Sequence, residues 1–426
     1  MLEDEQLPAL GPWAKGVNNV DKENSIGADE LRSAVNIDLD RQGNPRRRAG
    51  LTQRVELTDG HSVYSNSNLL VGCDGGTLYR IDPNLYSTTS LRSDLVPNRS
   101  LSYCDIQGSI YYSNGIQTGR ILPDGSLMGL GVSVPNSPTL ASASNGSLYA
   151  GSYQVCLTNV NSAGEESGST LANVVTIASD GGTIQITDIP QASGVSYVRI
   201  YATPPNGDTF YRHVEIPIGV TSYNLTTTIR GPVLETQFGE PMPGGHIIRY
   251  YRGRLYSADE SVVWFSEPLR YGLCKPLDDH LPDFGERITV MQPVHDGIYV
   301  VADKAYFLGG NNPHEMIPVV AHPHRGIEGT GIEVAPKMFN AEEVPGMLAY
   351  WFSENGPCLG FPGGLVSPPT EDRIAHAAYA SGASGFRQVE GIRSVVTSLR
   401  GKGSGSGFAA SDSLTFEVRR NGVLVE

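Results

Sequence analysis

Residues Leu69–Ile81 read LLVGCDGGTLYRI, which is an apolar run, a Cys-Asp-Gly-Gly turn and a second run in which apolar residues alternate. Short runs of this kind, broken by Gly, Asn or Asp, are typical of two antiparallel strands joined by a tight turn. Five further stretches repeat the pattern: Ser109–Leu122, Arg254–Glu267, Ile298–Gly310, Leu348–Gly364 and Phe408–Gly422. The sequence therefore predicts an all-β chain made of repeated hairpins.

The spacing of these hairpins predicts a β-propeller. Their first residues are separated by 40, 145, 44, 50 and 60 positions. A propeller blade takes roughly 40–50 residues, so each hairpin fits one blade. Removing the block 146–230, which is 85 residues long, brings the long interval back to 60. We expect six blades or seven, because residues 36–57 either close a blade with 414–426 or start one of their own.

The block 146–230 predicts a β-sandwich inserted into the propeller. Apolar residues alternate with polar ones around Tyr153, Ile184 and Val198, as in half-buried strands. Gly-, Pro- and Asn-rich turns separate these strands at intervals suited to a small antiparallel sandwich. With its AGEESG turn at 163–168, the block resembles a fibronectin type III or immunoglobulin-like module.

The expected organisation has four parts: an N-terminal arm, 1–28; a first part of the propeller, 29–145; the inserted sandwich, 146–230; and the remainder of the propeller, 231–426. Helical signals are scarce, and the two best are at 28–35 and 371–380.

Composition agrees with an all-β chain and excludes some functions. The 426 residues include 50 Gly, 28 Pro and 20 Tyr, and only 18% are charged. A formal net charge of −14 argues against a protein that grips nucleic acid through its phosphates. The negative charge has two possible roles: it repels DNA from the protein surface, or it only keeps the protein soluble.

The five cysteines are widely spaced and form no CxxC pair, so we expect buried free thiols. Residues Met1–Leu10 are acidic where a secretion signal would be basic and then apolar, and no run approaches the ~18 apolar residues of a membrane span. We therefore expect synthesis and assembly in a cytoplasm, with no membrane span.

The sequence matches no familiar catalytic motif in full, so we expect no catalytic, cofactor-binding or metal-binding residues and no enzyme. No phosphate-binding loop or dinucleotide fingerprint follows any strand. The histidines His314, His322 and His324 lie among prolines and are better explained as surface or packing residues than as metal ligands. The turn from Asp74 to Tyr79 resembles the aspartic box of sialidase propellers. It lacks the Ser and Trp of that motif, so turn geometry explains it better.

The segment ahead of the hairpins carries the most distinctive pattern. It reads GPW at 11–13, GVNN at 16–19, LRSAVNIDLD at 31–40 and GNPRRRAG at 43–50. This segment resembles the start of tail hub or nozzle proteins of short-tailed bacteriophages, also called packaged-DNA stabilisation proteins. The resemblance is strongest over 11–50 and extends to residue 426 only as a hairpin pattern.

The resemblance implies a virion structural protein in a homo-oligomeric, hexameric ring around the DNA-ejection channel, where it retains packaged DNA. Its implied partners are portal and adaptor proteins above, tail fibres, spikes or a needle, and DNA that passes without sequence-specific binding. Six copies would carry 84 net negative charges, some of them lining the channel. The sandwich would project as a docking platform.

Five residues are expected at the subunit interface: Pro12, Trp13, Arg46, Arg47 and Arg48. Trp13 either anchors the arm in a neighbouring subunit or caps its own propeller, with the first favoured. The three arginines either pair with acidic neighbours in the ring or form a solvated edge.

Two other functions stay open. A receptor- or glycan-binding tail propeller would hold its ligand in the loops at the top of the blades. A glycosidase, the less favoured alternative, would need a carboxylate pair and a tyrosine in one pocket.

Overall fold

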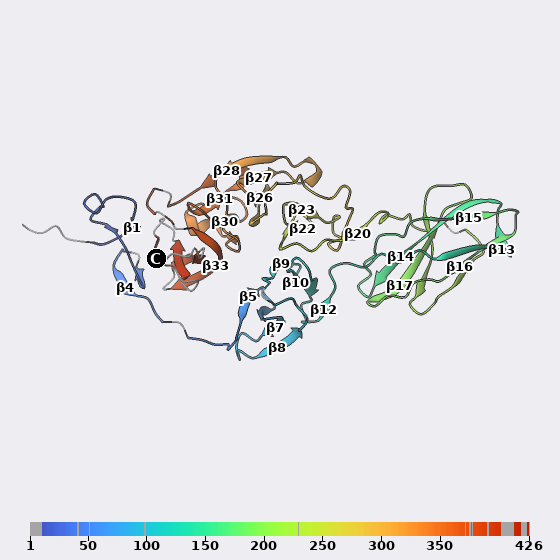
Figure 1. Ribbon diagram of the computed structural model, residues 1–426, viewed down its shortest axis with the longest axis horizontal. Coiled ribbons are helices and arrows are strands. Elements are labelled where there is room, and N and C mark those ends of the chain that lie inside the picture. The colour runs from blue at the N-terminus through green and yellow to red at the C-terminus, as the bar shows by residue number, and fades with distance from the viewer. Residues whose placement is uncertain are drawn as a thin grey trace, which may run out of the picture.

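The chain is all-β, and Figure 1 shows its computed structural model as an elongated row of small sheets. The structure describes residues 11–40, 42–50, 52–97, 99–228, 230–370, 372–374, 376, 378–389, 392–401, 413–418 and 424–425. Part of the predicted N-terminal arm, residues 1–10, lies outside this set, as does most of the sixth predicted hairpin.

Six antiparallel sheets follow one another along the chain, interrupted once between the second and the third. In each sheet, strands that are consecutive in sequence lie side by side. We number the sheets one to six in chain order. Sheet one is β5 (Gly60–Ser65), β6 (Leu70–Asp74), β7 (Thr77–Ile81) and β8 (Thr88–Arg92); sheet two is β9 (Ser102–Ile106), β10 (Ser109–Ser113), β11 (Thr118–Ile121) and β12 (Leu127–Met128); sheet three is β21 (Ile247–Tyr251), β22 (Arg254–Asp259) and β23 (Val262–Phe265). Sheet four is β25 (Val290–Val294), β26 (Gly297–Val301), β27 (Ala305–Gly309) and β28 (Pro318–His322); sheet five is β29 (Ile332–Val334), β30 (Leu348–Ser353), β31 (Gly356–Gly360) and β32 (Val366–Ser367); sheet six is β33 (Tyr379–Val389), β34 (Ile392–Gly401), β35 (Ser413–Val418) and β36 (Leu424–Val425).

The first five predicted hairpins are confirmed as antiparallel strand pairs of these sheets. In the first of them, Asp74 pairs with Thr77 and Gly75 adopts a φ of +54°, as the turn requires. The Asp74 carboxylate accepts the backbone N–H groups of Thr58 and Asp59. Turn geometry therefore accounts for Gly75, whereas Asp74 binds a segment 15–16 positions earlier in the chain.

Neighbouring sheets are held together by shared apolar clusters. Sheets one and two share a core that includes Val71, Leu78 and Ile110. Sheets three and four share Phe265 and Met291, and Trp351 of sheet five joins the core of sheet four. Because alternate residues of a strand point to opposite faces, a central sheet can bury one face against each neighbour.

The inserted block forms two sheets around one apolar core, at the right of Figure 1. One sheet has the order β13-β16-β19 and the other β15-β14-β17-β18. The first strand begins at Thr139, ahead of the expected boundary at 146, because 139–144 pair with 182–187. The strands are β13 (Thr139–Leu148), β14 (Gly151–Asn161), β15 (Asn173–Ile177), β16 (Gly182–Thr187), β17 (Val195–Ala202), β18 (Tyr211–Pro217) and β19 (Tyr223–Leu225). We call this block the inserted unit.

The N-terminal segment lies beside sheet six, at the left of Figure 1. It contains the parallel pair β1 (Gly16–Val17) and β2 (Glu30–Leu31), and the hairpin of β3 (Ile37–Leu39) and β4 (Pro45–Arg47). Val17 and Leu39 are buried in one cluster with Val395 and Leu399 of sheet six.

The expected helix at 28–35 is wrong, and the described residues of 371–380 form no helix either. In 28–35, Leu31 pairs with Val17 in a parallel bridge, so its backbone bonds across to another segment rather than along a helix. In 371–380, the described residues make a turn in which Arg373 and Ile374 donate to Thr370, and Tyr379 begins β33. Packing against neighbouring strands overrides a weak helical propensity.

Three short 3-10 turns and a small strand pair complete the described elements. They are η1 (Pro313–Glu315), η2 (Pro336–Phe339), η3 (Pro362–Gly364), β20 (Glu240–Pro241) and β24 (Leu273–Cys274). All five cysteines are buried free thiols, as expected, and burial raises the pKa of the Cys104 thiol to about 12. Within the described residues, no helix has the length and apolar character needed to cross a membrane.

Candidate functional site

The most elaborate polar site joins the inserted unit to sheets one to six, which we call the hairpin sheets. It is built on the turn after β14, which the sequence predicted as AGEESG. Asn161 accepts the backbone N–H groups of Ala163 and Glu165 through its side-chain oxygen, and Gly164 has a φ of +79°. This Asn-capped turn holds Glu165 and Glu166 next to each other at the end of the inserted unit.

Glu165 reaches out of the inserted unit to sheet two. Its two carboxylate oxygens accept from Nη1 and Nη2 of Arg120 on β11, each at 2.8 Å. Only 9% of the Arg120 side chain is exposed, and Nη1 also donates to the Tyr111 hydroxyl at 3.2 Å. A planar guanidinium that binds a carboxylate through two bonds fixes orientation as well as distance.

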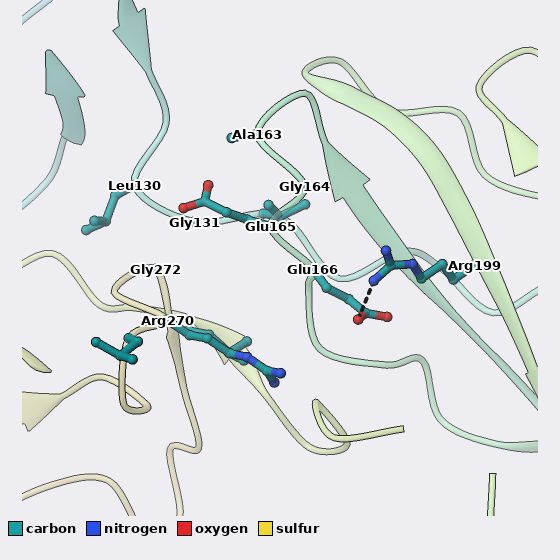
Figure 2. A pocket seen from close by; sticks show the side chains of 12 residues that line it. Leu130, Gly131, Ala163, Gly164, Glu165, Glu166, Arg199, Arg270 and Gly272 are labelled. Carbon is teal, nitrogen blue, oxygen red and sulfur yellow. Dashed lines mark hydrogen bonds and ion pairs between the residues drawn. The ribbon is translucent and has the colours of Figure 1, made fainter. Parts of the chain in front are cut away.

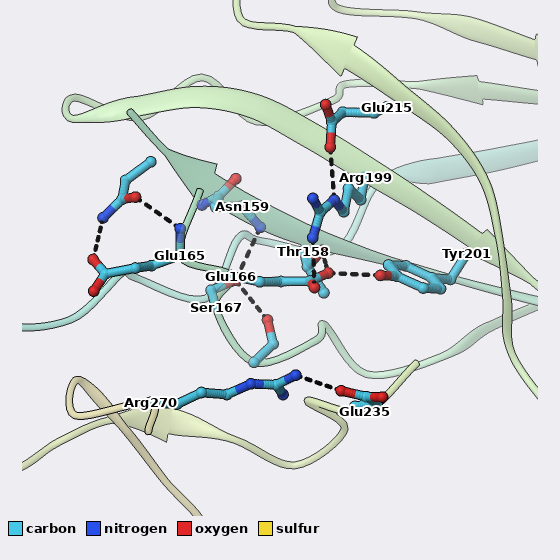
Figure 3. Close-up of polar contacts among 12 residues, drawn as sticks. Thr158, Asn159, Glu165, Glu166, Ser167, Arg199, Tyr201, Glu215, Glu235 and Arg270 are labelled. Atoms are coloured by element: carbon cyan, nitrogen blue, oxygen red, sulfur yellow. Dashed lines mark hydrogen bonds and ion pairs between the residues drawn. The ribbon is translucent and has the colours of Figure 1, made fainter. Parts of the chain in front are cut away.

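Glu166 points the other way and ties the turn to its own sheet, as Figure 3 shows. Its carboxylate accepts from the hydroxyls of Thr158 and Tyr201, at 2.6 and 2.7 Å, and from Arg199 at 2.7 Å. Arg199 also donates through Nε to the Glu215 carboxylate, at 2.7 Å. Burial, followed by the bond to Glu166, raises the pKa of Tyr201 well above its ordinary value. The hydroxyl therefore stays a donor to Glu166.

A fourth ion pair joins Arg270, from the loop after β23, to Glu235, in the segment that leaves the inserted unit. Arg270 also lines a cleft of about 270 Å³ with Glu165, Glu166 and Arg199, as Figure 2 shows. Apolar walls from Leu130, Val132, Leu269 and Leu273 complete this cleft.

Glycines allow the backbones to cross closely at this place. A Cβ on Gly272 would lie 1.9 Å from the Leu130 carbonyl oxygen, and one on Gly131 would lie 2.5 Å from that of Gly272. The segment that leaves the inserted unit makes a second close approach, where a Cβ on Gly168 would lie 1.6 Å from the Gly239 carbonyl oxygen. Only glycine fits such contacts without a backbone shift. The carboxylates of Glu165 and Glu166 are already bound by arginine side chains of the same chain. The site is therefore suited to fixing the angle between the inserted unit and the hairpin sheets.

A second polar site, which sequence reasoning also missed, joins several hairpin sheets. The Arg249 guanidinium donates to Ser102 Oγ in sheet two at 3.0 Å and to Gln292 Oε1 in sheet four at 3.2 Å. It also donates to the carbonyl oxygens of Ile248, at 2.7 Å, and of Gly331, at 3.4 Å. The available signal was an arginine inside the apolar run Ile247–Tyr251. Arg249 therefore bonds sheets two, three and four and the start of sheet five.

The predicted interface residues lie together in the N-terminal segment. Trp13 is half-buried against the chain's own cluster beside sheet six, in the manner of a local cap, and Pro12 is exposed. Arg46 and Arg47 are exposed, and Arg46 lies 3.9 Å from Asp40. A contact between subunits stays a prediction for all five residues.

Arg48 has a clear partner within the chain. Its Nε lies 3.1 Å from Asp38, and the same carboxylate accepts two bonds from Arg387 on β33, at 2.8 and 2.6 Å. The Arg387 guanidinium, followed by Arg48, holds the pKa of Asp38 below its usual value, against the effect of burial.

The histidines that the sequence singled out do not converge. His314 lies 3.6 Å from Asp279 and meets the Phe265 ring edge-on. His322 and His324 meet ring to ring at 5.2 Å, and His324 bonds Asn355. Among the residues whose positions are described, no group of three His, Cys, Asp or Glu side chains is placed to hold a metal.

No protein-family model and no curated protein matches the chain. Similar solved structures include the computationally designed Ika8 protein, at 12% identity and a TM-score of 0.32 over 87% of this chain and 98% of that one. An extracellular domain from B. thetaiotaomicron matches at 10% identity and 0.23, over 89% and 66%. Porphyromonas gingivalis dipeptidyl peptidase 4 matches at 8% and 0.27, over 87% and 51%. Scores at this level carry no conclusion about fold or function.

Proposed function

We propose that the chain is a structural subunit of the tail of a short-tailed bacteriophage, a hub or nozzle protein that forms a ring around the DNA-ejection channel. The observation that carries the proposal is the segment 11–50, whose GPW, GVNN and RRR elements resemble the start of that family. Nothing in the proposal requires catalysis. The protein acts through shape and charge, in the virion, after assembly in the host cytoplasm.

The proposed architecture is a six-bladed β-propeller with an inserted fibronectin III-like or immunoglobulin-like sandwich. Six successive antiparallel sheets with shared cores support the propeller. The hairpin β3–β4 contacts β36, which favours closing the sixth blade over starting a seventh. A three-stranded and a four-stranded sheet around one core support the sandwich.

Ring formation suits this architecture because a propeller with protected strand edges meets its copies through loops. A net charge of −14 per chain supports a wall that lets DNA pass without binding it. The ion pair between Glu165 and Arg120 supports the use of the inserted unit as a platform held at one angle for fibres, spikes or a needle.

Electron microscopy of the purified full-length protein tests the proposal. We expect rings with a central hole, and six-fold class averages would establish the copy number. A protein that stays monomeric at concentrations of tens of micromolar, alone and with the portal and adaptor proteins, would contradict it.

Arg47 allows a sharper test of the subunit interface. It is exposed and has no ion-pair partner in the described part of the chain, whereas Arg48 is engaged with Asp38. Arg47→Glu should weaken ring assembly without lowering the melting temperature. The control is Arg80→Glu, since Arg80 is an exposed arginine of sheet one outside the predicted interface. If the two variants assemble equally well, Arg47 does not contribute to the subunit interface.

A further inference from the structure

A second cleft lies in the inserted unit, away from the joint at Glu165. It has a volume of about 380 Å³, at the lower end of the range typical of small-ligand sites, roughly 300–1,000 Å³. The turn between β13 and β14, the end of β17 with the loop after it, the start of β18 and the segment after β19 contribute its walls. Its lining is unusual in combining two tyrosines, two prolines, a histidine and an arginine.

One wall is held rigid before any ligand arrives. Pro204 and Pro205 have fixed φ angles, and Asn206 anchors the loop that follows them. The Asn206 side-chain oxygen accepts the backbone N–H of Ser152 at 3.0 Å, and the Asn206 backbone N–H donates to the Ser152 carbonyl at 2.7 Å. A preformed wall lowers the entropy that a ligand loses on binding.

The aromatic residues of the cleft stay accessible. Tyr149 is 67% exposed, although a tyrosine ring gains free energy when it is buried. Tyr211 is half-buried on the first position of β18. Exposed tyrosine beside proline offers a flat apolar surface with a polar rim, which suits a ligand with one apolar face.

Two polar groups of the cleft lack partners. The buried His213 Nδ1 has no hydrogen-bond partner, although Nε2 lies 3.3 Å from the Tyr223 hydroxyl. Burial lowers the pKa of His213 and so favours the neutral ring, in which Nδ1 can donate or accept depending on the tautomer. Within the described residues, the exposed Arg230 has no hydrogen-bond or ion-pair partner. An unpaired guanidinium at a cleft in a chain of net charge −14 favours an anionic ligand.

We infer that this cleft binds an acidic saccharide, a sugar ring that carries a carboxylate. A pyranose ring has an apolar face of C–H groups for Tyr149 and Tyr211, and hydroxyls at its edge for His213 and Thr228. Its carboxylate can take two parallel bonds from Arg230. This inference does not depend on the tail-hub proposal, and it places the ligand on the inserted unit instead of the loops of the hairpin sheets.

A matched pair of probes tests it on the full-length protein: glucuronic acid and glucose, which differ only in the carboxylate. Saturation-transfer NMR and calorimetry should detect glucuronic acid at millimolar concentration and glucose roughly tenfold more weakly, the ratio expected for one charge-assisted contact. Absence of any glucuronic acid signal up to tens of millimolar would overturn the inference.

Three variants locate the binding. Tyr149→Ala should abolish the signals of both sugars, and Arg230→Gln should reduce glucuronic acid to the level of glucose. The control Tyr197→Ala removes a tyrosine that is 43% exposed on β17, outside the cleft, and should bind as the unchanged protein does. Binding that survives Tyr149→Ala, or an acid preference that survives Arg230→Gln, would overturn the assignment. Equal melting temperatures check that each variant folds.

Discussion

Asp38 and Arg387 lie 349 positions apart in the chain, and two parallel hydrogen bonds of 2.8 and 2.6 Å join their side chains. The pair fastens the hairpin β3–β4 to sheet six. About 15% of the Asp38 side chain and 22% of the Arg387 side chain are exposed, so solvent screens the bonds only in part. The segment with the strongest resemblance to tail hub proteins is thereby attached to the end of the same chain.

Loss of this pair should lower stability in a pH-dependent way. We expect Asp38→Asn to reduce the free energy of unfolding by about 1–2 kcal/mol at pH 7, the usual size for a charge-assisted contact. Because the folded state lowers the Asp38 pKa, this stabilisation is present above the unfolded value of about 3.9 and is lost as pH falls through the lower folded value.

Urea unfolding from pH 7 to pH 3 measures this effect. The difference between the unchanged protein and Asp38→Asn should shrink below about pH 4. Asp208→Asn is the control, since its carboxylate lies in an exposed loop and, among the described residues, accepts only from its neighbour Thr209. A gap of constant size across this pH range would argue against the ion pair as its source.

The joint of the inserted unit can be tested by a double-mutant cycle on Arg120 and Glu165. Arg120→Met and Glu165→Gln should each destabilise the protein, and the double variant should lose less than the sum, with a coupling of about 1 kcal/mol. Small-angle scattering should show a wider spread of inserted-unit positions in either single variant. A coupling near zero together with unchanged scattering would mean that the backbone crossings alone fix the angle.

The glycine crossing predicts a steric effect at a single atom. Gly272→Ala places a methyl group against the Leu130 carbonyl, so we expect a loss of about 1–3 kcal/mol, as for other overpacked sites. Gly385→Ala in β33 meets no atom within 4 Å and should change stability little. Thermal unfolding of both variants compares them directly, and equal melting temperatures would show that the crossing can relax.

Arg249 should be the most sensitive polar residue of the hairpin sheets. Arg249→Met removes donors from four acceptors at once, and we expect a loss of about 2–4 kcal/mol, since unpaired buried acceptors cost about 1–3 kcal/mol each and some will find water. Arg80→Met, at an exposed arginine of sheet one, is the matched control. Denaturant unfolding of the two variants decides whether Arg249 holds the sheets together or only lies between them.

Local sequence predicted much of the fold because hairpins depend on neighbours in the chain. The Gly75 turn, the strands around it and the Asn161–Gly168 turn all follow from residues within about ten positions of one another. The same reasoning failed at 28–35, where a distant segment supplies the hydrogen bonds, and at 371–380, where the described residues make a short local turn that leads into β33. It also began the inserted unit at 146 and missed the pairing of β13 from Thr139 onward.

An all-β chain of repeated hairpins with one inserted block follows from the amino-acid sequence, because turn residues and alternating apolar residues act locally. The positions where charged groups meet follow from the tertiary fold. Glu165 lies 45 positions from Arg120, and Asp38 and Arg387 come from opposite ends of the chain. Such pairs cannot be predicted from the spacing of residues in the sequence, since the free energy of an ion pair depends on distance in space and on exclusion of water.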